Sequence, residues 1–355
     1  MRPLSIEGIG ILCARGRGIE EFDTALRAGW VPPLFNAEGR PAYRINAEDL
    51  ADREVLTRAR RADRFSKMTV LAAYDALVDG GSGSGERLEM GIIVATALGA
   101  HASIFRFLDD IIDFGEFEVS PTTFVHTLHN AAASYATSVL GCQGPTVTVT
   151  QFYFAFHEAL QVAYAWLAEG RVERVLVGVT EECSPAMEYI YTEKMSIAYD
   201  GRMRPLSCSP TPTVVPGEGS AFFLLSFDET RSKYGCISEI DVGPQRKAPD
   251  GCNLYVIGAN AMGGSEEFYE QIFSHGINAA AYSDLYGGMM SGAAFECAAG
   301  ALMLKNQLRY GSTVLGKPVT WCVSTTTRPY ELDAILCVAH NPQCDLAFLK
   351  MIDRT

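Results

Sequence analysis

The chain has 355 residues, of which 48% are hydrophobic and 20% charged, so disordered, collagen-like and coiled-coil classes are excluded. Its 29 Lys and Arg against 42 Asp and Glu give a formal net charge of -13, which argues against nucleic acid or an anionic membrane surface as the main ligand. The ten cysteines occur singly, without any CxxC pair, and match neither a disulfide framework nor a zinc site.

The cysteines and the N-terminus together suggest a location. Cys297 and Cys322 lie in apolar runs, where a free cysteine behaves as a small core residue. The N-terminus lacks a basic segment followed by a long apolar one, and no apolar run reaches about 18 residues. We therefore expect no secretion signal, no membrane span and a reducing, cytoplasmic location.

The first half of the sequence alternates between strand and helix patterns. Strands are predicted from apolar or β-branched runs, and helices from apolar residues at three- and four-residue spacing. In chain order these segments are 3–13 (strand), 18–30 (helix), 60–81 (helix), 90–100 (strand), 101–114 (helix), 120–141 (helix), 144–152 (strand), 154–170 (helix) and 172–182 (strand). The alternation predicts a mainly parallel sheet covered by helices.

The second half repeats the alternation less regularly. Its predicted segments are 218–228 (strand), 236–244 (strand), 255–264 (apolar), 266–277 (helix), 291–304 (helix), 318–327 (strand) and 334–340 (strand). We therefore predict two related α/β halves, residues 1–228 and a shorter 229–355.

Five segments in this order resemble the β-ketoacyl synthases. They are Ile6 to Gly10, the basic helix start Arg60 to Phe65, Gly144 to Thr146, Arg204-Pro205 followed by Pro216 to Gly219, and Ser291 to Leu302. The resemblance covers nearly the whole chain. It implies an α/β, thiolase-like fold, in which two pseudo-repeated halves form a layered α-β-α-β-α core.

The resemblance also locates the catalytic positions of active members. These use a cysteine nucleophile at a helix N-terminus and two histidines that promote decarboxylation. The nucleophile position falls on Tyr153, the first histidine on Ala259 and the second on Met289. A phenol with an ordinary pKa near 10 is a poor acyl-transfer nucleophile, and neither alanine nor methionine replaces an imidazole. We therefore expect no catalysis by this chain alone, and no cofactor or metal.

An inert ketosynthase homologue resembles the chain length factor of type II polyketide systems. The resemblance implies a heterodimer with an active β-ketoacyl synthase, access to an acyl carrier protein through that complex, and a role in shaping the acyl tunnel. Many such subunits carry Gln where this chain carries Tyr153. The divergent second half favours a polyene system, such as aryl polyene assembly.

Two groups of apolar residues are candidates for the tunnel or the subunit interface. The aromatics Phe152, Phe154 and Phe156 flank Tyr153 and are expected to fill this chain's own acyl pocket, either as core packing or as a tunnel wall. The second group is Leu98, Ile104, Phe105 and Leu108, for which core packing is the alternative.

Two other functions remain open. The chain could be an acyltransferase or decarboxylase with relocated groups, for which His157 is the nearest base and would contact Tyr153. It could also be a stand-alone acyl or carrier-protein binding module that uses its basic cluster, Arg58, Arg60, Arg61 and Arg64.

Several polar residues are expected to have other roles. His126 and His129 lack a third metal ligand nearby and are expected in packing. The acidic residues of GVTEE and PGEG are expected to be solvated or structural. The segment 292–304, rich in small and apolar residues, and the strand after Gly144 are expected to suit burial in an interface.

Overall fold

The computed structural model describes residues 1–83, 88–205, 213–244, 248–258, 272–273, 277–314, 321–343 and 345–353. Among the helices of these residues, none is both long enough and apolar enough to cross a bilayer.

The N-terminal strand β1 (Leu4–Cys13) is buried along its whole length. Its glycines make room for the long helix α2 (Arg64–Asp79). A Cβ atom on Gly10 would lie 2.0 Å from the carbonyl oxygen of Ala72 on that helix. Only glycine fits such an approach, so the glycines of this strand serve the packing of α2 on β1.

Five strands form the first half of the central sheet. They follow the order β6, β5, β7, β8, β1, in which β6, β5 and β7 are parallel and β8 is antiparallel to both neighbours. Besides β1, these strands are β5 (Gly91–Thr96), β6 (Thr146–Thr150), β7 (Arg174–Glu181) and β8 (Gly219–Ser226). All of them lie within predicted strand segments.

The second half repeats this pattern. Its strands follow the order β11, β10, β15, β16, β9, with two parallel pairs followed by two antiparallel pairs. They are β9 (Cys236–Gly243), β10 (Leu254–Ile257), β11 (Asn278–Ala280), β15 (Ala334–His340) and β16 (Leu346–Ile352), and β13 (Cys322–Val323) extends the row beyond β11. The two pseudo-repeated α/β halves are therefore confirmed.

The two half-sheets join in the middle of the molecule. Leu4 pairs with Ile237 and Ser5 with Cys236, so β1 and β9 are antiparallel neighbours. In the described part of the chain this makes one twelve-stranded sheet, which includes the short β2 (Gly16–Arg17) beside β1. The expected boundary after residue 228 falls between β8 and β9, and the division into two domains stays a prediction.

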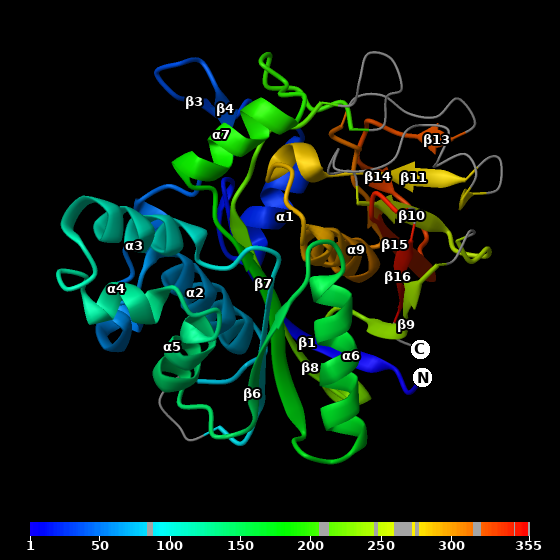
Figure 1. Ribbon diagram of the computed structural model, residues 1–355. Coiled ribbons are helices and arrows are strands. Elements are labelled where there is room, and N and C mark those ends of the chain that lie inside the picture. Colours follow the sequence, from blue (N-terminus) through cyan, green and yellow to red (C-terminus); the bar gives the residue numbers. More distant parts are fainter. Residues whose placement is uncertain are drawn as a thin grey trace.

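Helices lie both outside and between the half-sheets (Figure 1). α2 and α5 (Ala131–Leu140) cover the outer face of the first half. α6 (Ala155–Ala168) contacts β5 and β7 of the first half and β9 and β16 of the second, and α9 (Ala293–Asn306) contacts β8, β15 and β16. These two helices form the central layer of the expected layered core.

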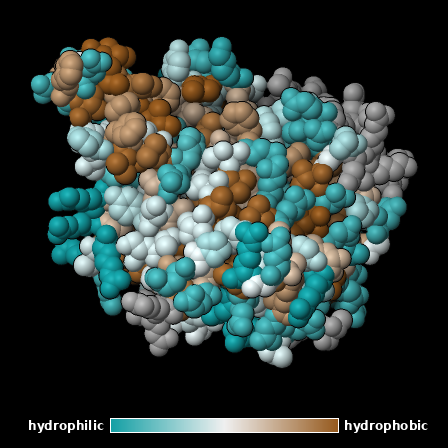
Figure 2. All heavy atoms as spheres, turned by 60° about the horizontal axis from the view of Figure 1, so that its bottom comes forward, coloured by the Kyte–Doolittle hydropathy of each residue, from teal (hydrophilic) through white to brown (hydrophobic). Residues whose placement is uncertain are grey.

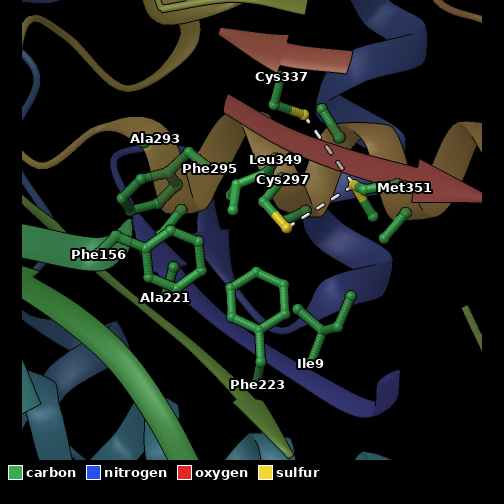
Figure 3. Close-up of a cluster of buried hydrophobic side chains, with 14 of the residues drawn as sticks. Ile9, Phe156, Ala221, Phe223, Ala293, Phe295, Cys297, Cys337, Leu349 and Met351 are labelled. Atoms are coloured by element: carbon green, nitrogen blue, oxygen red, sulfur yellow. Dashed lines mark hydrogen bonds between the residues drawn. The ribbon is translucent and has the colours of Figure 1, made fainter. Parts of the chain in front are cut away.

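Side chains from both halves meet around this central layer (Figure 3). The rings of Phe156 on α6 and Phe223 on β8 are 5.3 Å apart between centroids. On the other side, Cys297 Sγ of α9 lies 3.8 Å from Met351 Sδ of β16. Because one cluster contains residues of both halves, the halves share a single core.

The remaining described elements are helices at the surface, short strands and 3-10 turns. They are α1 (Ile19–Ala28), β3 (Leu34–Phe35), β4 (Pro41–Ala42), η1 (Glu48–Leu50), η2 (Val55–Ala59), α3 (His101–Phe114), α4 (Pro121–His126), α7 (Pro185–Lys194), η3 (Glu229–Arg231), η4 (Ser283–Leu285), β12 (Leu308–Arg309) and β14 (Arg328–Pro329).

Some segments differ from their predictions or cannot be compared with them. The helix predicted over 120–141 is two helices, α4 and α5, because the Thr127 hydroxyl and backbone N–H both donate to the Phe124 carbonyl oxygen and end α4 there. The strand β16 was not predicted. The helix predicted over 266–277 lies mostly outside the described residues, and of the strand predicted over 318–327 the described part forms only β13.

Candidate functional site

A small cavity lies beside the N-terminus of α6, where strands of both halves end. Its volume is about 10 Å³, at the lower limit for one water molecule. Its lining residues are Tyr153, Gly258, Ser283, Tyr286, Gly287, Met289, Met290, Gly292, Ala293, Glu296, Ala339 and His340. Tyr153 and Met289, two of the three expected catalytic positions, are thus brought together. The third, Ala259, lies outside the described residues, although its neighbour Gly258 lines the cavity.

Tyr153 lies in the turn between β6 and α6. Two hydrogen bonds of the Gln151 side chain stabilise this turn. Gln151 Oε1 accepts a hydrogen bond from the Phe154 backbone N–H, and its Nε2 donates to Glu158 Oε1, both at 2.7 Å. The Tyr153 side chain is partly buried, and burial raises the pKa of its hydroxyl. At neutral pH it therefore stays a protonated phenol, which is a poor nucleophile.

Met289 follows a turn, residues 286–288, whose backbone packs directly against the backbone of the PGEG segment. A Cβ on Gly217 would lie 2.0 Å from the Tyr286 carbonyl oxygen, and the Gly288 N–H donates to the Val215 carbonyl oxygen at 2.8 Å. This close contact fixes the buried Met289 side chain at the cavity wall. Its thioether is at most a weak hydrogen-bond acceptor.

Two titratable residues of the cavity were missed by the sequence analysis. Glu296 Oε1 accepts a hydrogen bond from the Tyr286 hydroxyl at 2.7 Å, and within the described residues no hydrogen bond reaches Oε2. Burial raises the pKa of Glu296 to about 8 and lowers the pKa of His340 to about 4. Both side chains are therefore neutral at pH 7.

Sequence signals for these two residues exist. His340 is the last residue of β15, and the carboxyl ends of parallel strands converge where α/β proteins place their sites. Glu296 is the one carboxylate in the apolar helix segment 293–304, and a carboxylate in such a setting is rarely buried without a specific partner.

The aromatic run around Tyr153 does not fill the cavity as expected. Phe154 and Phe156 are 3% and 0% exposed and belong to the core between the half-sheets, not to the cavity wall. Phe152 is 55% exposed, so its expected burial in this chain's own pocket is wrong. The turn that Gln151 holds directs successive aromatic residues to the surface, the cavity and the core.

His157 is buried in the same core. Its ring packs edge-on against Phe154 and Phe156, with centroids 6.0 and 6.3 Å away, and it does not line the cavity. Burial lowers its pKa to about 3. The expected contact with Tyr153 is thus replaced by contacts with two phenylalanines.

Residues 101–130 form a protruding segment, here called the arm, which consists of α3, α4 and their connections. The structure describes all thirty residues, and only His101 and His126 are buried. Its exposed large apolar side chains are Phe105, Leu108, Ile112, Phe114, Phe117, Phe124, Val125 and Leu128. Figure 2 shows apolar side chains gathered at the upper left of one face, the side on which Figure 1 places α3 and α4.

The four tunnel or interface candidates near the arm separate into two groups. Phe105 and Leu108 are exposed, so core packing is wrong for them, and Ile104 is partly exposed beside them. Leu98 instead packs, partly buried, on a small cluster that contains Met187.

The edge strand β6 lies at one end of the sheet. In the described part of the chain no strand pairs with its outer edge, and Thr146, Val147 and Thr150 are exposed. The strand after Gly144 is thus available to an interface, as expected. α9, the other segment expected to suit an interface, is instead buried inside its own chain from Ala293 to Leu304.

The glutamates of the GVTEE and PGEG segments are buried, so the solvated alternative is wrong and the structural one holds. Glu181 Oε1 accepts hydrogen bonds from the Ala97 backbone N–H and the Ser291 hydroxyl, both at 2.5 Å. Burial raises the pKa of Glu181 to about 7 and that of Glu182 to about 8. Because Ser291 precedes α9, Glu181 links the two halves of the chain.

The other polar candidates have ordinary environments. His126 Nε2 lies 3.2 Å from the Tyr135 hydroxyl, and no group of three metal-binding side chains occurs among the described residues. Cys297 is buried as expected, whereas Cys322 is exposed, against the expectation from its apolar run. Arg64 pairs with Glu218, in contrast to the exposed Arg58, Arg60 and Arg61.

A larger hollow of about 780 Å³ lies at the other end of α6. Its arginines are already engaged: Arg174 pairs with Glu7 at 2.7 Å, Arg231 pairs with Asp228 at 3.1 Å, and Arg2 lies over the Phe227 ring. The hollow is open to solvent and contains none of the three expected catalytic positions, so the small cavity at Tyr153 is the candidate site.

Comparisons with solved structures agree with this fold. The ishigamide ketosynthase/chain length factor matches with a TM-score of 0.79, 15% identity and 100% coverage of both chains. A β-ketoacyl synthase from Burkholderia phymatum STM815 matches with a TM-score of 0.82, 17% identity and coverage of 99% and 100%. The structure described as AntDE:AntF, a type II PKS acyl-carrier protein in complex with its ketosynthase, matches with a TM-score of 0.79, 14% identity and 99% coverage of both chains.

Comparisons of sequence give the family. Nodulation protein E of Rhizobium sp. (strain N33) is 24% identical over 71% of this chain, and its counterpart from Rhizobium leguminosarum bv. trifolii is 25% identical over 66%. The matches span only 65% and 60% of those two proteins. The family model "Beta-ketoacyl synthase, N-terminal domain" matches residues 41–230, more than half of the chain. This chain therefore belongs to the β-ketoacyl synthase family.

Proposed function

We propose that this chain is a non-catalytic subunit that forms a heterodimer with an active β-ketoacyl-ACP synthase and helps to shape its acyl tunnel, as a chain length factor does. One observation carries the proposal: the cavity lined by Tyr153 and Met289 holds about 10 Å³. An acyl group has no room there, and neither side chain supplies a thiolate or an imidazole.

The surface supports a partner subunit. β6 is a Thr and Val strand with an open edge and none of the prolines or lysines that protect exposed edges from pairing. The arm, which precedes α5 and β6 in the sequence, exposes eight large apolar side chains. Each Phe or Leu left in water forgoes about 1.5–3 kcal/mol of burial free energy, so a partner that covers them gains stability.

The similar proteins support the kind of partner. One similar structure is itself described as a ketosynthase/chain length factor, and another contains an acyl-carrier protein bound to its ketosynthase. Tyr153 at the nucleophile position favours the polyene type of system, including aryl polyene assembly. The eight described cysteines are free, which supports action in a reducing compartment such as the cytoplasm.

Co-expression with an active ketosynthase from the same source organism tests the proposal. Native mass spectrometry should show a one-to-one complex, and an acyl label should appear only on the partner's cysteine. A Tyr153→Phe variant is the matched control, because it removes the phenol without opening the cavity and should leave complex and labelling unchanged. A stable monomer or homodimer that never binds the ketosynthase would overturn the proposal.

A second candidate function is an acyltransferase or decarboxylase with relocated groups. It is favoured by Glu296 and His340, a neutral acid and a neutral imidazole on one cavity wall. Purified chain incubated with labelled malonyl-carrier protein would then release CO₂, and His340→Ala would abolish the release. In the same assay, His157→Ala tests whether His157, the base expected from the sequence, takes part.

A stand-alone binding module for the acidic carrier protein is the third candidate. The exposed Arg58, Arg60 and Arg61 supply a basic surface on a chain of net charge -13. Charge reversal at Arg60 and Arg61 should then weaken carrier-protein binding by the chain alone. Unchanged binding would remove this candidate.

A further inference from the structure

The arm has almost no packing of its own against the rest of the chain. Of the fourteen residues of α3, only His101, the first, is buried. The helix contacts α4, where the rings of Phe107 and Phe124 lie 5.6 Å apart, but α4 is exposed as well, and the contact between α3 and α7 is small. The direction in which α3 projects is therefore set at its N-terminal turn.

Three hydrogen bonds hold this turn. The buried Glu182, at the end of β7, accepts the Ala102 backbone N–H through Oε1 at 2.7 Å. The Ser103 hydroxyl donates to Asp63 Oδ2 at 2.8 Å. The Ser184 backbone N–H donates to His101 Nε2 at 3.4 Å. Of these anchors, Glu182 alone bonds the helix backbone, from a position 80 residues away in the sequence.

A carboxyl group suits this position. The first N–H groups of a helix have no partner inside the helix, and they carry the positive end of its dipole. A side-chain oxygen that accepts one of them fixes both the start and the direction of the helix. No side chain of α3 supplies this bond, because the N-cap residue is Ala100.

We propose that Glu182 is a positioning residue, which holds α3 in the orientation that binds the partner ketosynthase. This inference rests on the proposed function, since it concerns how the same partner is bound. Glu182 itself is buried and does not line the cavity, so it acts through the helix that it anchors.

The chemistry of the arm specifies the partner's surface. Around its apolar side chains the arm carries five acidic residues against one basic residue: Asp109, Asp110, Asp113, Glu116 and Glu118 against Arg106. The complementary surface is apolar with a basic rim. The arm adjoins α5, where His126 Nε2 lies 3.2 Å from the Tyr135 hydroxyl, and α5 in turn contacts the edge strand β6.

The test compares Glu182→Ala with Glu182→Gln in the complex with the partner ketosynthase. Burial raises the pKa of Glu182 to about 8, so the amide of Gln imitates the neutral side chain and keeps its acceptor oxygen. We expect Glu182→Ala to weaken binding by about fivefold to tenfold, as loss of a helix cap does, and to speed hydrogen exchange in residues 103–114. Glu182→Gln should restore both properties. Glu169→Ala, which removes an exposed glutamate, is the matched control.

The outcomes separate the inference from the proposed function. If Glu182→Ala binds like the wild type while Leu108→Asp abolishes binding, the inference fails and the proposed function stands. If the wild type binds no ketosynthase, the proposed function fails. If Glu182→Ala does not fold, Ser103→Ala decides, because it removes only the bond to Asp63. About threefold weaker binding with faster exchange in α3 supports the inference, and wild-type behaviour overturns it.

Discussion

The cavity and the arm are opposite extremes of packing within one chain. At the cavity, twelve residues from both halves leave about 10 Å³, whereas in the arm thirty residues bury only two. A working synthase needs the reverse at the first place, a pocket open to an acyl chain. Under the proposed function, this difference means that the chain offers exposed side chains to a partner's surface and no open pocket to a substrate.

One expected effect concerns the pH dependence of stability, through the buried carboxyl of the cavity. Burial raises the pKa of Glu296 from its ordinary 4.5 to about 8, so the folded state retains a proton that the unfolded state loses. Its contribution to stability is therefore complete below about pH 4.5 and is lost as the pH rises toward 8. Glu296→Gln should make the fall in unfolding free energy shallower by up to about 1.4 kcal/mol per pH unit between pH 5.5 and 7.5.

Denaturant unfolding at several pH values measures this slope. Glu169→Gln is the control, because Glu169 is exposed and should leave the slope unchanged. An unchanged slope in Glu296→Gln would mean that the carboxyl is ionised in the folded protein. The surroundings of Glu296 would then be more polar than its burial indicates.

The aromatic run allows a comparison between neighbouring residues. Phe156→Ala should lower the free energy of unfolding by about 3–5 kcal/mol, because the ring is fully buried against Phe223. Phe152→Ala should cost less than about 1 kcal/mol in the isolated chain, since more than half of the ring is in water. Equal losses would contradict the division of the run between core and surface.

The arm is tested by charge on its apolar face. The double variant Phe105→Asp, Leu108→Asp should weaken ketosynthase binding by about 100-fold, which corresponds to about 2.7 kcal/mol, and leave unfolding of the isolated chain nearly unchanged. Leu34→Asp, at an exposed leucine of β3 outside the arm, is the matched control. Titration calorimetry and thermal unfolding supply the two measurements. Loss of stability without loss of binding would make the arm a structural element.

The smallest effect is expected at Gln151, in the turn between β6 and α6. Gln151→Ala removes the bonds to the Phe154 N–H and to Glu158, and should cost about 1 kcal/mol of unfolding free energy. Gln151→Glu keeps the acceptor oxygen for the Phe154 N–H but places a second carboxylate against Glu158, and should cost at least as much. Faster hydrogen exchange in residues 152–156 should accompany the loss. A silent Gln151→Ala would mean that α6 alone fixes the turn.

Most of the longer strands were predictable because each is a run of apolar or β-branched residues of strand length. The buried runs of β1, β5, β7 and β8 indicate their positions without tertiary information. The break between α4 and α5 was not predictable in this way, because a local side-chain bond of Thr127 overrides an otherwise helical pattern. β16 was missed although its sequence, LAFLKMI, is an apolar run of the same kind.

The site was predictable in part. Counting along the family motifs led to Tyr153 and Met289, which the fold does bring together. The exposure of Phe152 depends on a side-chain bond of Gln151, and the role of Glu296 depends on a tyrosine ten residues earlier that the fold turns back onto α9. Neither contact has a sequence pattern of its own.

The pairing of β1 with β8 and β9 has a consequence for how the chain assembles during synthesis. During synthesis, β1 finds its partner strands only when residues 219–237 have followed it, more than 200 positions later. Pairings of such high contact order form slowly, and until then the apolar β1 is an unprotected strand that can associate with other chains.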